Sequence, residues 1–271
     1  MPEENRRLAV LADLRDRFKW LAVFDDGDSG DIYYPEALPL VDEYWKKQLY
    51  RDRNQYPAQI ASQMHKIRLA WNLGIGSFPV SSAQLTWARR AVHFLSPHTL
   101  RFFYRDPRKF QRPGAPKENF VSARFPVHTG NSIVRDHRAL FQKTADQSPL
   151  FRTGTVPRRQ FYAELDRSTA VLSPYGYGEI CFRDFEAILH ESVLFKPDMS
   201  HLETWPDVYL PMKTYVPLEH DGSDLIARAR EVIQNPMLRE ELVNNASRVY
   251  RAAFEELQTR LDLLLSGLEI S

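Results

Sequence analysis

Cysteine is nearly absent from this chain of 271 residues, in which Cys181 is the single thiol. A lone cysteine excludes an internal disulfide framework and a zinc site made of several cysteines, and it is typical of a reducing compartment. Residues 1–18 contain no long apolar run, because charges recur every few positions, and this excludes a secretory leader or a membrane span there. We therefore expect a cytoplasmic protein, whose contact with an inner membrane would be peripheral, through an amphipathic face.

A surplus of charge of one sign is also missing. Lys and Arg number 36 against 35 for Asp and Glu, so the formal net charge is +1. This balance gives no global attraction to nucleic acid or to anionic lipid, and any anion site must be local. One segment mixes basic and aromatic side chains at helical spacing: Tyr44, Trp45, Lys46, Lys47, Tyr50, Arg51 and Arg53. We interpret it as the face of an amphipathic helix and predict no nucleic-acid site.

The second half of the chain alternates short apolar runs with helical patterns. The predicted strands are residues 120–127, 150–152, 169–173, 192–196 and 214–218, and the predicted helices are 132–145, 158–166, 179–191 and two more after residue 223. This alternation predicts a parallel sheet with helices on both faces. The basic, proline-rich stretch 105–119 predicts a linker, which divides the chain into domains 1–105 and 106–271.

The first half shows only one clear strand, at residues 20–24, after an opening helical pattern. Two complete doubly wound domains of about 150 residues each would need more residues than this chain holds. We therefore expect an N-terminal domain that is reduced in size.

The stretch SPYGYGEICFRDFEA, residues 173–187, carries the clearest chemical signal. It follows an apolar strand, holds Gly176 and Gly178 in a turn, and enters a helix in which Arg183 and Glu186 share a face. Ligands of open parallel sheets bind outside the carboxyl ends of the strands, where a glycine turn and a helix N-terminus can approach a phosphate. Arginine suits a diphosphate and a carboxylate suits ribose hydroxyls. The alternative is a weak surface pair of Arg and Glu.

Residues 181–187, after the glycine turn and a Ser-Pro strand end, resemble the donor-site signature of exostosin-like glycosyltransferases and related bacterial glycosyltransferases of the GT-B fold. Residues 196–199 and 223–250 resemble the loop and closing helices that follow, so the resemblance covers residues 120–255. It implies a GT-B-like α/β protein, with a doubly wound parallel-sheet donor domain and a reduced N-terminal α/β part.

The same resemblance implies an activity. The protein would move a sugar from a nucleotide-diphosphate donor to an acceptor hydroxyl in glycan or polysaccharide synthesis, without a metal or another cofactor. Arg183 would neutralise the leaving diphosphate and Glu186 would hold the ribose. The spacing of Glu179 and Glu186 departs by one residue from that of the bacterial retaining enzymes, so the anomeric outcome stays open.

The predicted donor site draws on two segments. The glycine-turn segment contributes Ser173, Tyr175, Gly176, Tyr177, Gly178, Glu179, Arg183 and Glu186, and the first turn of the same domain contributes His128, Asn131 and Arg135. For the second group, an ordinary loop histidine and surface arginine are equally expected. The polar and aromatic loop 200–206 is a further candidate, which would cover the sugar.

Three acids follow the first predicted strand, at Asp25, Asp26 and Asp28. A carboxylate at a strand end is well placed to act as a general base on an acceptor hydroxyl, so Asp25 and Asp28 are candidate catalytic residues. Alternatively, Asp26 and Asp28 would hold the metal of a GT-A-type transferase. An EF-hand is excluded because Ala37 stands where the bidentate glutamate belongs. Solvated loop acids are the plain alternative.

Two other functions remain open at this point. The small N-terminal part would also fit a noncatalytic nucleotide-sugar-binding protein, which lacks an acceptor site and works with a partner subunit. An α/β nucleotide-binding enzyme of different chemistry is the other, since a fold does not fix a function.

Overall fold

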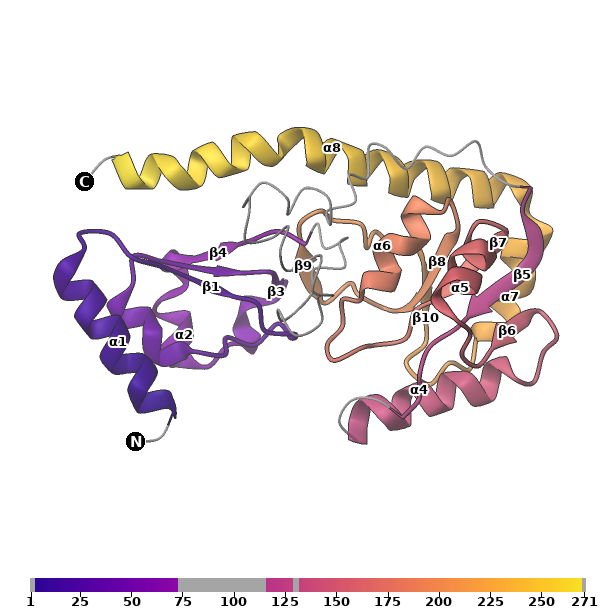
Figure 1. Cartoon of the computed structure of the whole chain (residues 1–271), viewed down its shortest axis with the longest axis horizontal. Helices are drawn as coiled ribbons and strands as arrows, with labels where there is room; N and C mark the ends of the chain where they lie inside the picture. Colours follow the sequence, from indigo (N-terminus) through magenta and orange to yellow (C-terminus); the bar gives the residue numbers. More distant parts are fainter. Residues whose placement is uncertain (1–2, 73–115, 129–131, 270–271) are drawn as a thin grey trace, which may run out of the picture.

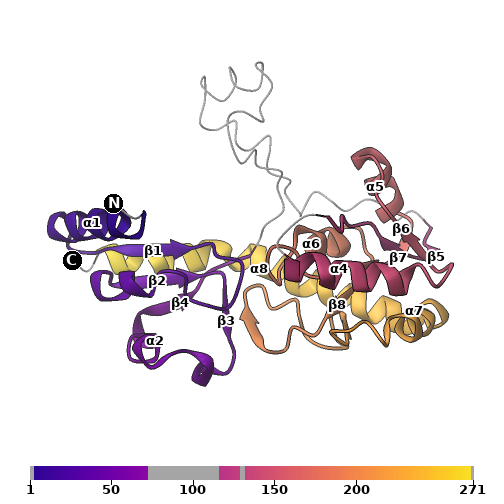
Figure 2. The same ribbon diagram turned by 90° about the horizontal axis from the view of Figure 1, so that it is seen from below.

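The computed structural model describes residues 3–72, 116–128 and 132–269. These residues form two α/β units, and the last helix runs along both of them (Figures 1 and 2). The predicted boundary between residues 105 and 106 lies outside the described residues.

The N-terminal unit, residues 3–72, is built on a three-stranded parallel sheet in the order β1-β2-β4. Its strands are β1 (Ala22–Asp25), β2 (Glu43–Lys46), β3 (Gln48–Tyr50), which lies outside that sheet, and β4 (Ile67–Leu69). Its helices are α1 (Glu3–Arg17), α2 (Ala58–Ala61) and the 3-10 helices Pro35–Leu40, Arg53–Gln55 and Met64–Lys66. Leu38, Tyr44 and Ile67 are buried together in its core.

Of two elements predicted in this unit, the structure confirms one and contradicts the other. The strand predicted at residues 20–24 is confirmed as β1. The amphipathic helix predicted over the basic and aromatic segment is wrong, because the segment forms the short strands β2 and β3 and, from Arg53, a turn of 3-10 helix. These strands are only four and three residues long, and Lys46 on β2 is fully buried. A buried lysine breaks the polar and apolar alternation that marks a strand in a sequence.

The C-terminal unit contains a five-stranded parallel sheet in the order β10-β8-β7-β5-β6. The strands are β5 (Glu118–Ala123), β6 (Phe151–Thr153), β7 (Ser168–Leu172), β8 (Val193–Pro197) and β10 (Val216–Leu218). The helices are α4 (Ser132–Ala145), α5 (Arg158–Leu165), α6 (Phe182–Leu189), α7 (Leu225–Gln234) and α8 (Pro236–Glu269). The chain leaves β5 toward β6 on one side and then returns to β7 on the other, so the order of strands reverses between β5 and β7.

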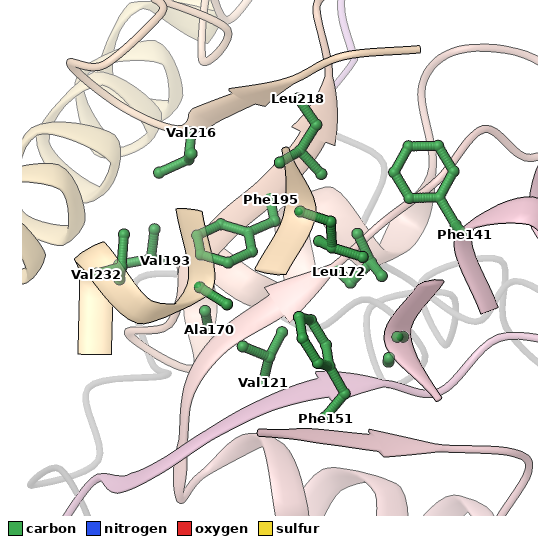
Figure 3. Close-up of a cluster of buried hydrophobic side chains, with 14 of the residues drawn as sticks. Val121, Phe141, Phe151, Ala170, Leu172, Val193, Phe195, Val216, Leu218 and Val232 are labelled. Carbon is green, nitrogen blue, oxygen red and sulfur yellow. The ribbon is translucent and has the colours of Figure 1, made fainter. Parts of the chain in front are cut away.

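Alternate residues of the central strands face opposite sides of this sheet. Leu172 and Phe195 pack with α4 and α7 on one face, in the cluster that Figure 3 shows. Val171 and Leu194 pack with α6 and α8 on the other face. Helices on both faces keep water from both sides of the strands, which explains why these strands read as continuous apolar runs. The predicted doubly wound α/β class of this unit is confirmed.

One predicted boundary near the motif is wrong. The sequence predicted a helix over residues 179–191, but α6 begins only at Phe182, after the extended N-cap residue Cys181. The Asp184 carboxylate accepts a hydrogen bond from the Cys181 backbone N–H at 3.0 Å, which completes a capping box. Glu179 therefore lies in the loop and not on the helix.

The two units are joined by more than the chain connection. Strand β3 of the first unit pairs antiparallel with β9 (Leu202–Thr204) of the second. Arg51 Nη2 donates to the Leu202 carbonyl at 3.0 Å, and Arg260 on α8 donates to the Leu69 carbonyl at 2.7 Å. Strand β9 was not predicted, because its partner strand lies about 150 residues away in the sequence.

Within the described residues, no helix combines the length and the apolar character that crossing a bilayer requires.

Candidate functional site

The carboxyl ends of the two sheets meet at the junction of the units. The loop after β1 reaches the glycine turn after β7, where a Cβ on Gly178 would overlap the Asp28 carbonyl oxygen. Only glycine permits this approach. Gln48 on β3 donates to the Glu179 carboxylate at 2.7 Å across the same junction.

The reversal of strand order between β5 and β7 marks a second candidate position for a ligand, because ligands of doubly wound sheets bind at the carboxyl edge where the order reverses. Buried Arg138 on α4 links the two loops that leave these strands. Its Nε donates to the Tyr175 carbonyl at 2.8 Å and its Nη1 donates to the Pro126 carbonyl at 3.0 Å. Arg138 thereby fixes the glycine turn relative to the loop after β5.

A buried ion pair holds the base of this turn. Lys196 Nζ lies 3.0 Å from the Asp184 carboxylate, and both side chains are fully buried. The same carboxylate accepts hydrogen bonds from Ser173 Oγ at 2.5 Å and from the Tyr209 hydroxyl at 2.7 Å. Burial and the neighbouring Asp184 charge raise the pKa of Tyr209 well above its usual value, so its hydroxyl stays a donor. Ser173 therefore anchors the turn to the first turn of α6.

Arg183 stands in the first turn of α6, beside this anchored turn. Its guanidinium carbon lies 5.9 Å from the centre of the Phe125 ring, on the loop after β5. Its Nε is buried and has no hydrogen-bond partner among the described residues. Burial lowers the pKa of Arg138, and the nearby positive charge of Arg183 lowers it further. Two guanidinium groups thus face the strand reversal, and one of them has an unused buried donor.

Glu186 lies one turn further along α6 and contacts Tyr162 of α5. Its carboxylate accepts a hydrogen bond from the Tyr162 hydroxyl of α5 at 3.0 Å. The Tyr162 ring stacks on His190, whose Nδ1 lies 2.7 Å from Asp166. Arg183 and Glu186 therefore share a side of the helix without contacting each other.

The other residues of the glycine turn differ in exposure. Tyr177 is 76% exposed, whereas Tyr175 is half-buried and stacks on His137 with the ring centres 4.9 Å apart. Glu179 is mostly buried, with 18% of its side chain exposed, and lies 4.0 Å from His201 Nε2. A Cβ on Gly176 would come within 2.8 Å of Cys181 Sγ, so this glycine keeps the turn against the N-cap of α6.

The site residues predicted in the first turn of the domain are His128, Asn131 and Arg135. His128 and Arg135 are both exposed, on the loop after β5 and on α4. Asn131 lies outside the described residues.

Asp25 is buried at the carboxyl end of β1, with only 2% of its surface exposed. Its carboxylate accepts hydrogen bonds from the Tyr44 hydroxyl at 2.6 Å and from two backbone N–H groups, those of Gly27 at 2.7 Å and Tyr33 at 3.1 Å. Lys46 Nζ lies 3.2 Å away and is equally buried. The four partners occupy both oxygens, so Asp25 holds the loop in place.

Asp26 and Asp28 are closer to solvent and share one lysine. Lys47 Nζ lies 2.6 Å from Asp28 and 3.3 Å from Asp26. Desolvation lowers the pKa of Lys47, but its contacts with these carboxylates outweigh that effect and raise it above the usual value. The Lys47 ammonium thus contacts both carboxylates, and the described residues contain no group of three or more His, Cys, Asp or Glu side chains that could hold a metal ion.

Several residues of this site escaped the sequence analysis. Arg138, Gln48, Asp184 and Lys196 were not singled out as site residues. Their roles depend on contacts between distant segments, as between Gln48 and Glu179, which are 131 residues apart. Asp184 carried a local signal, since an acid three residues after an N-cap position is typical of a capping box.

Two cavities among the described residues lie away from this edge. One of about 670 Å³ lies between α8 and the amino ends of β5 and β7, where it is lined by Lys117 and Arg239 among others. Another of about 500 Å³ lies beneath α1.

The chain matches no protein-family model and no curated protein. It is similar to the solved structure of TarM, at 12% identity and a TM-score of 0.48, over 94% of this chain and 58% of TarM. It is also similar to a glycosyltransferase from Rickettsia africae ESF-5, at 9% identity and a TM-score of 0.47, over 98% of this chain and 82% of that one. An alpha1,3-fucosyltransferase matches at 12% identity and a TM-score of 0.34, over 87% and 77%. The chain thus spans a little over half of the length of TarM.

Proposed function

We propose that this protein is a glycosyltransferase that moves a sugar from a nucleotide-diphosphate donor to a hydroxyl of a glycan acceptor. The C-terminal unit binds the donor at the strand reversal between β5 and β7. The N-terminal unit faces it and receives the acceptor. In the reaction, the acceptor oxygen bonds to the anomeric carbon, the bond from that carbon to the diphosphate breaks, and its electron pair leaves with the diphosphate.

The observation that carries this proposal is the unused Nε–H of Arg183. A buried donor without a partner costs about 1–3 kcal/mol, and a bound anion removes that cost. The position beside Arg138 and at the start of α6 adds two further positive contributions for a diphosphate. Such preorganised cations stabilise the charge that develops on the leaving group.

Donor binding in this proposal needs no metal, because arginine supplies the positive charge. Glu186 takes the ribose, and the Tyr162 hydroxyl orients its carboxylate. Asp28 is the acid that remains for the acceptor proton, since both oxygens of Asp25 are occupied.

The pairing of Asp26 and Asp28 with Lys47 favours one second candidate. A protein with both acids neutralised would bind a nucleotide sugar without transferring it, and would serve as a noncatalytic subunit beside a partner. Tight donor binding with no release of nucleoside diphosphate, for any hydroxyl acceptor offered, would favour this candidate.

A thermal-shift screen against nucleoside diphosphates and their sugars tests the proposal. UDP is the first ligand to use, since a TarM mutant from S. aureus was solved with UDP, Fondaparinux and alpha-GlcNAc-glycerol. A ligand at one hundred times its Kd stabilises the folded state by about 2.7 kcal/mol, which raises Tm by several degrees. Arg183→Ala should reduce the shift by about half or more, while Arg230→Ala, an exposed arginine on α7, should retain it. No shift with any nucleotide would refute the proposal.

A further inference from the structure

Gln48 combines full burial with an unsatisfied polar atom at the junction of the two units. Its side chain is 0% exposed, and it comes from β3 of the N-terminal unit. Its Nε2 donates to Glu179 at 2.7 Å, but its Oε1 is buried and has no partner among the described residues.

The orientation of this amide follows from the chemistry of its partner. Burial raises the pKa of Glu179, but hydrogen bonds and charge from the facing His201 and Gln48 side chains lower it by more. The pKa of Glu179 therefore lies below its usual value. An ionised carboxylate only accepts hydrogen bonds, so the amide nitrogen must face Glu179. The amide oxygen is therefore the atom left over, and since no donor among residues 3–72, 116–128 and 132–269 reaches it, it is open to a donor from a ligand or a water.

The surroundings of this oxygen suit a hydroxyl group. Glu179 supplies a second acceptor, and His201 Nε2 lies 4.0 Å from that carboxylate, too far for a direct hydrogen bond. A hydroxyl both donates and accepts, so it can bridge groups of this kind. The loop of Glu179 begins at the glycine turn, next to the groups assigned to the diphosphate.

We infer that Gln48 is a positioning residue of the donor site, which holds Glu179 across the junction and offers its amide oxygen to a hydroxyl of the transferred sugar. This inference rests on the proposed function. It implies that the sugar subsite is completed by the N-terminal unit, whereas the nucleotide and diphosphate bind to the C-terminal unit alone.

Calorimetric titration of the full chain tests this division of roles, using a nucleoside diphosphate and the same diphosphate carrying its sugar. Gln48→Met keeps the size of the side chain and removes both polar atoms. We expect it to leave the Kd of the nucleoside diphosphate unchanged and to weaken the nucleotide sugar about five-fold, as the loss of one hydrogen bond does. Gln63→Met is the matched control, since Gln63 Oε1 is also buried without a partner but lies elsewhere in the N-terminal unit.

A second variant separates positioning from folding. In Gln48→Glu two carboxylates face each other, with His201, Tyr50 and Tyr175 as the other titratable groups around Glu179. At pH 8 their repulsion should weaken sugar binding about ten-fold or more, relative to the wild type at the same pH. At pH 5.5 the pair shares a proton and the hydrogen bond returns, so binding should recover. A purely structural defect would not recover on acidification.

Three outcomes are distinct. Weaker binding of the nucleotide sugar alone, with recovery of Gln48→Glu at low pH, supports the inference. An equal effect of Gln48→Met on both ligands, or no effect on either, overturns it while the proposed function stands. No binding of either ligand to the wild type overturns both.

Discussion

Each unit has a buried Asp–Lys ion pair, hydrogen-bonded to a tyrosine, at the carboxyl edge of its sheet. In the N-terminal unit, Asp25 pairs with Lys46 and accepts a hydrogen bond from the Tyr44 hydroxyl. In the C-terminal unit, Asp184 pairs with Lys196 and accepts from the Tyr209 hydroxyl. All four charged side chains of the pairs are fully buried.

The units differ in the basic side chain that lies beside each buried pair, Lys47 in the first and Arg183 in the second. Lys47 in the N-terminal unit is neutralised by Asp26 and Asp28, whereas Arg183 in the C-terminal unit has a buried donor without a partner. Charge is balanced within the protein at the edge of the N-terminal unit, whereas the edge of the C-terminal unit keeps a buried donor without a partner among the described residues. This difference supports the proposal of an anion site in the C-terminal unit, although both edges offer strand ends and short polar loops.

The largest expected effect comes from breaking either buried pair. Asp184→Asn should lower the free energy of unfolding by about 3–5 kcal/mol, because it leaves the Lys196 ammonium buried without a counter-charge. Asp25→Asn should cost a similar amount in the N-terminal unit. Urea unfolding curves of both variants measure this. A loss below about 1 kcal/mol in one of them would show that the two pairs are not equivalent.

Gly178→Ala should have the next largest effect, since its new methyl group would meet the Asp28 carbonyl. We expect a loss of about 1–3 kcal/mol, which is typical of overpacking against backbone. Gly176→Ala should cost less, because its one close contact would be the Cys181 thiol at 2.8 Å and its next neighbour, Arg138 Nη2 at 3.5 Å, is at ordinary contact distance. Comparison of the two variants in the same unfolding experiment tests whether the units are in firm contact, and equal losses would contradict that contact.

A smaller, pH-dependent effect is expected from His137, beneath Tyr175. Burial and the nearby positive charges lower its pKa to about 4, from an ordinary value of 6.5. Between these values the unfolded chain binds more protons than the folded one, so stability should fall as the pH drops from 6.5 to 4. His137→Phe should reduce this acid sensitivity, and the control His65→Gln, an exposed position, should not. Tm values measured across this range decide the matter, and identical profiles for wild type and His137→Phe would be the contrary result.

The smallest effect concerns the acids of the N-terminal unit. Lys47→Met removes the shared cation from Asp26 and Asp28, so weak binding of Mn²⁺ should appear there. Calorimetry with Mn²⁺ checks this, with Lys66→Met as a control at a lysine that contacts the Leu38 carbonyl. Equally strong Mn²⁺ binding by the wild type would instead support the GT-A alternative.

The fold of the C-terminal unit was predictable because its signals are local. Both faces of its strands are covered, so residues 168–172 and 193–197 read as apolar runs between helical patterns. The glycine turn likewise marked its own position. In the N-terminal unit the strands are too short to show such a pattern. Lys46 is also fully buried against its protein partners, and the alternation of polar and apolar residues does not predict a buried lysine.

The candidate site was predictable only in part, for the same reason. Arg183 was singled out in the sequence because it follows a glycine turn at a strand end. Arg138 and Gln48 act through carbonyl and carboxylate groups of distant segments, and nothing in their immediate sequence indicates this. The interpretation of Asp25 as a base failed to anticipate that both of its oxygens are occupied within the fold.

Calorimetric titration of the wild type, Arg183→Ala and Arg230→Ala with a nucleoside and with its diphosphate tests the central claim most directly. The claim that Arg183 is the cation left for a diphosphate predicts that Arg183→Ala weakens the diphosphate about ten- to one-hundred-fold, as the loss of a charge-assisted hydrogen bond does, and leaves the nucleoside unaffected. Arg230→Ala should match the wild type with both ligands. Equal affinity of the wild type and Arg183→Ala for the diphosphate would contradict the claim.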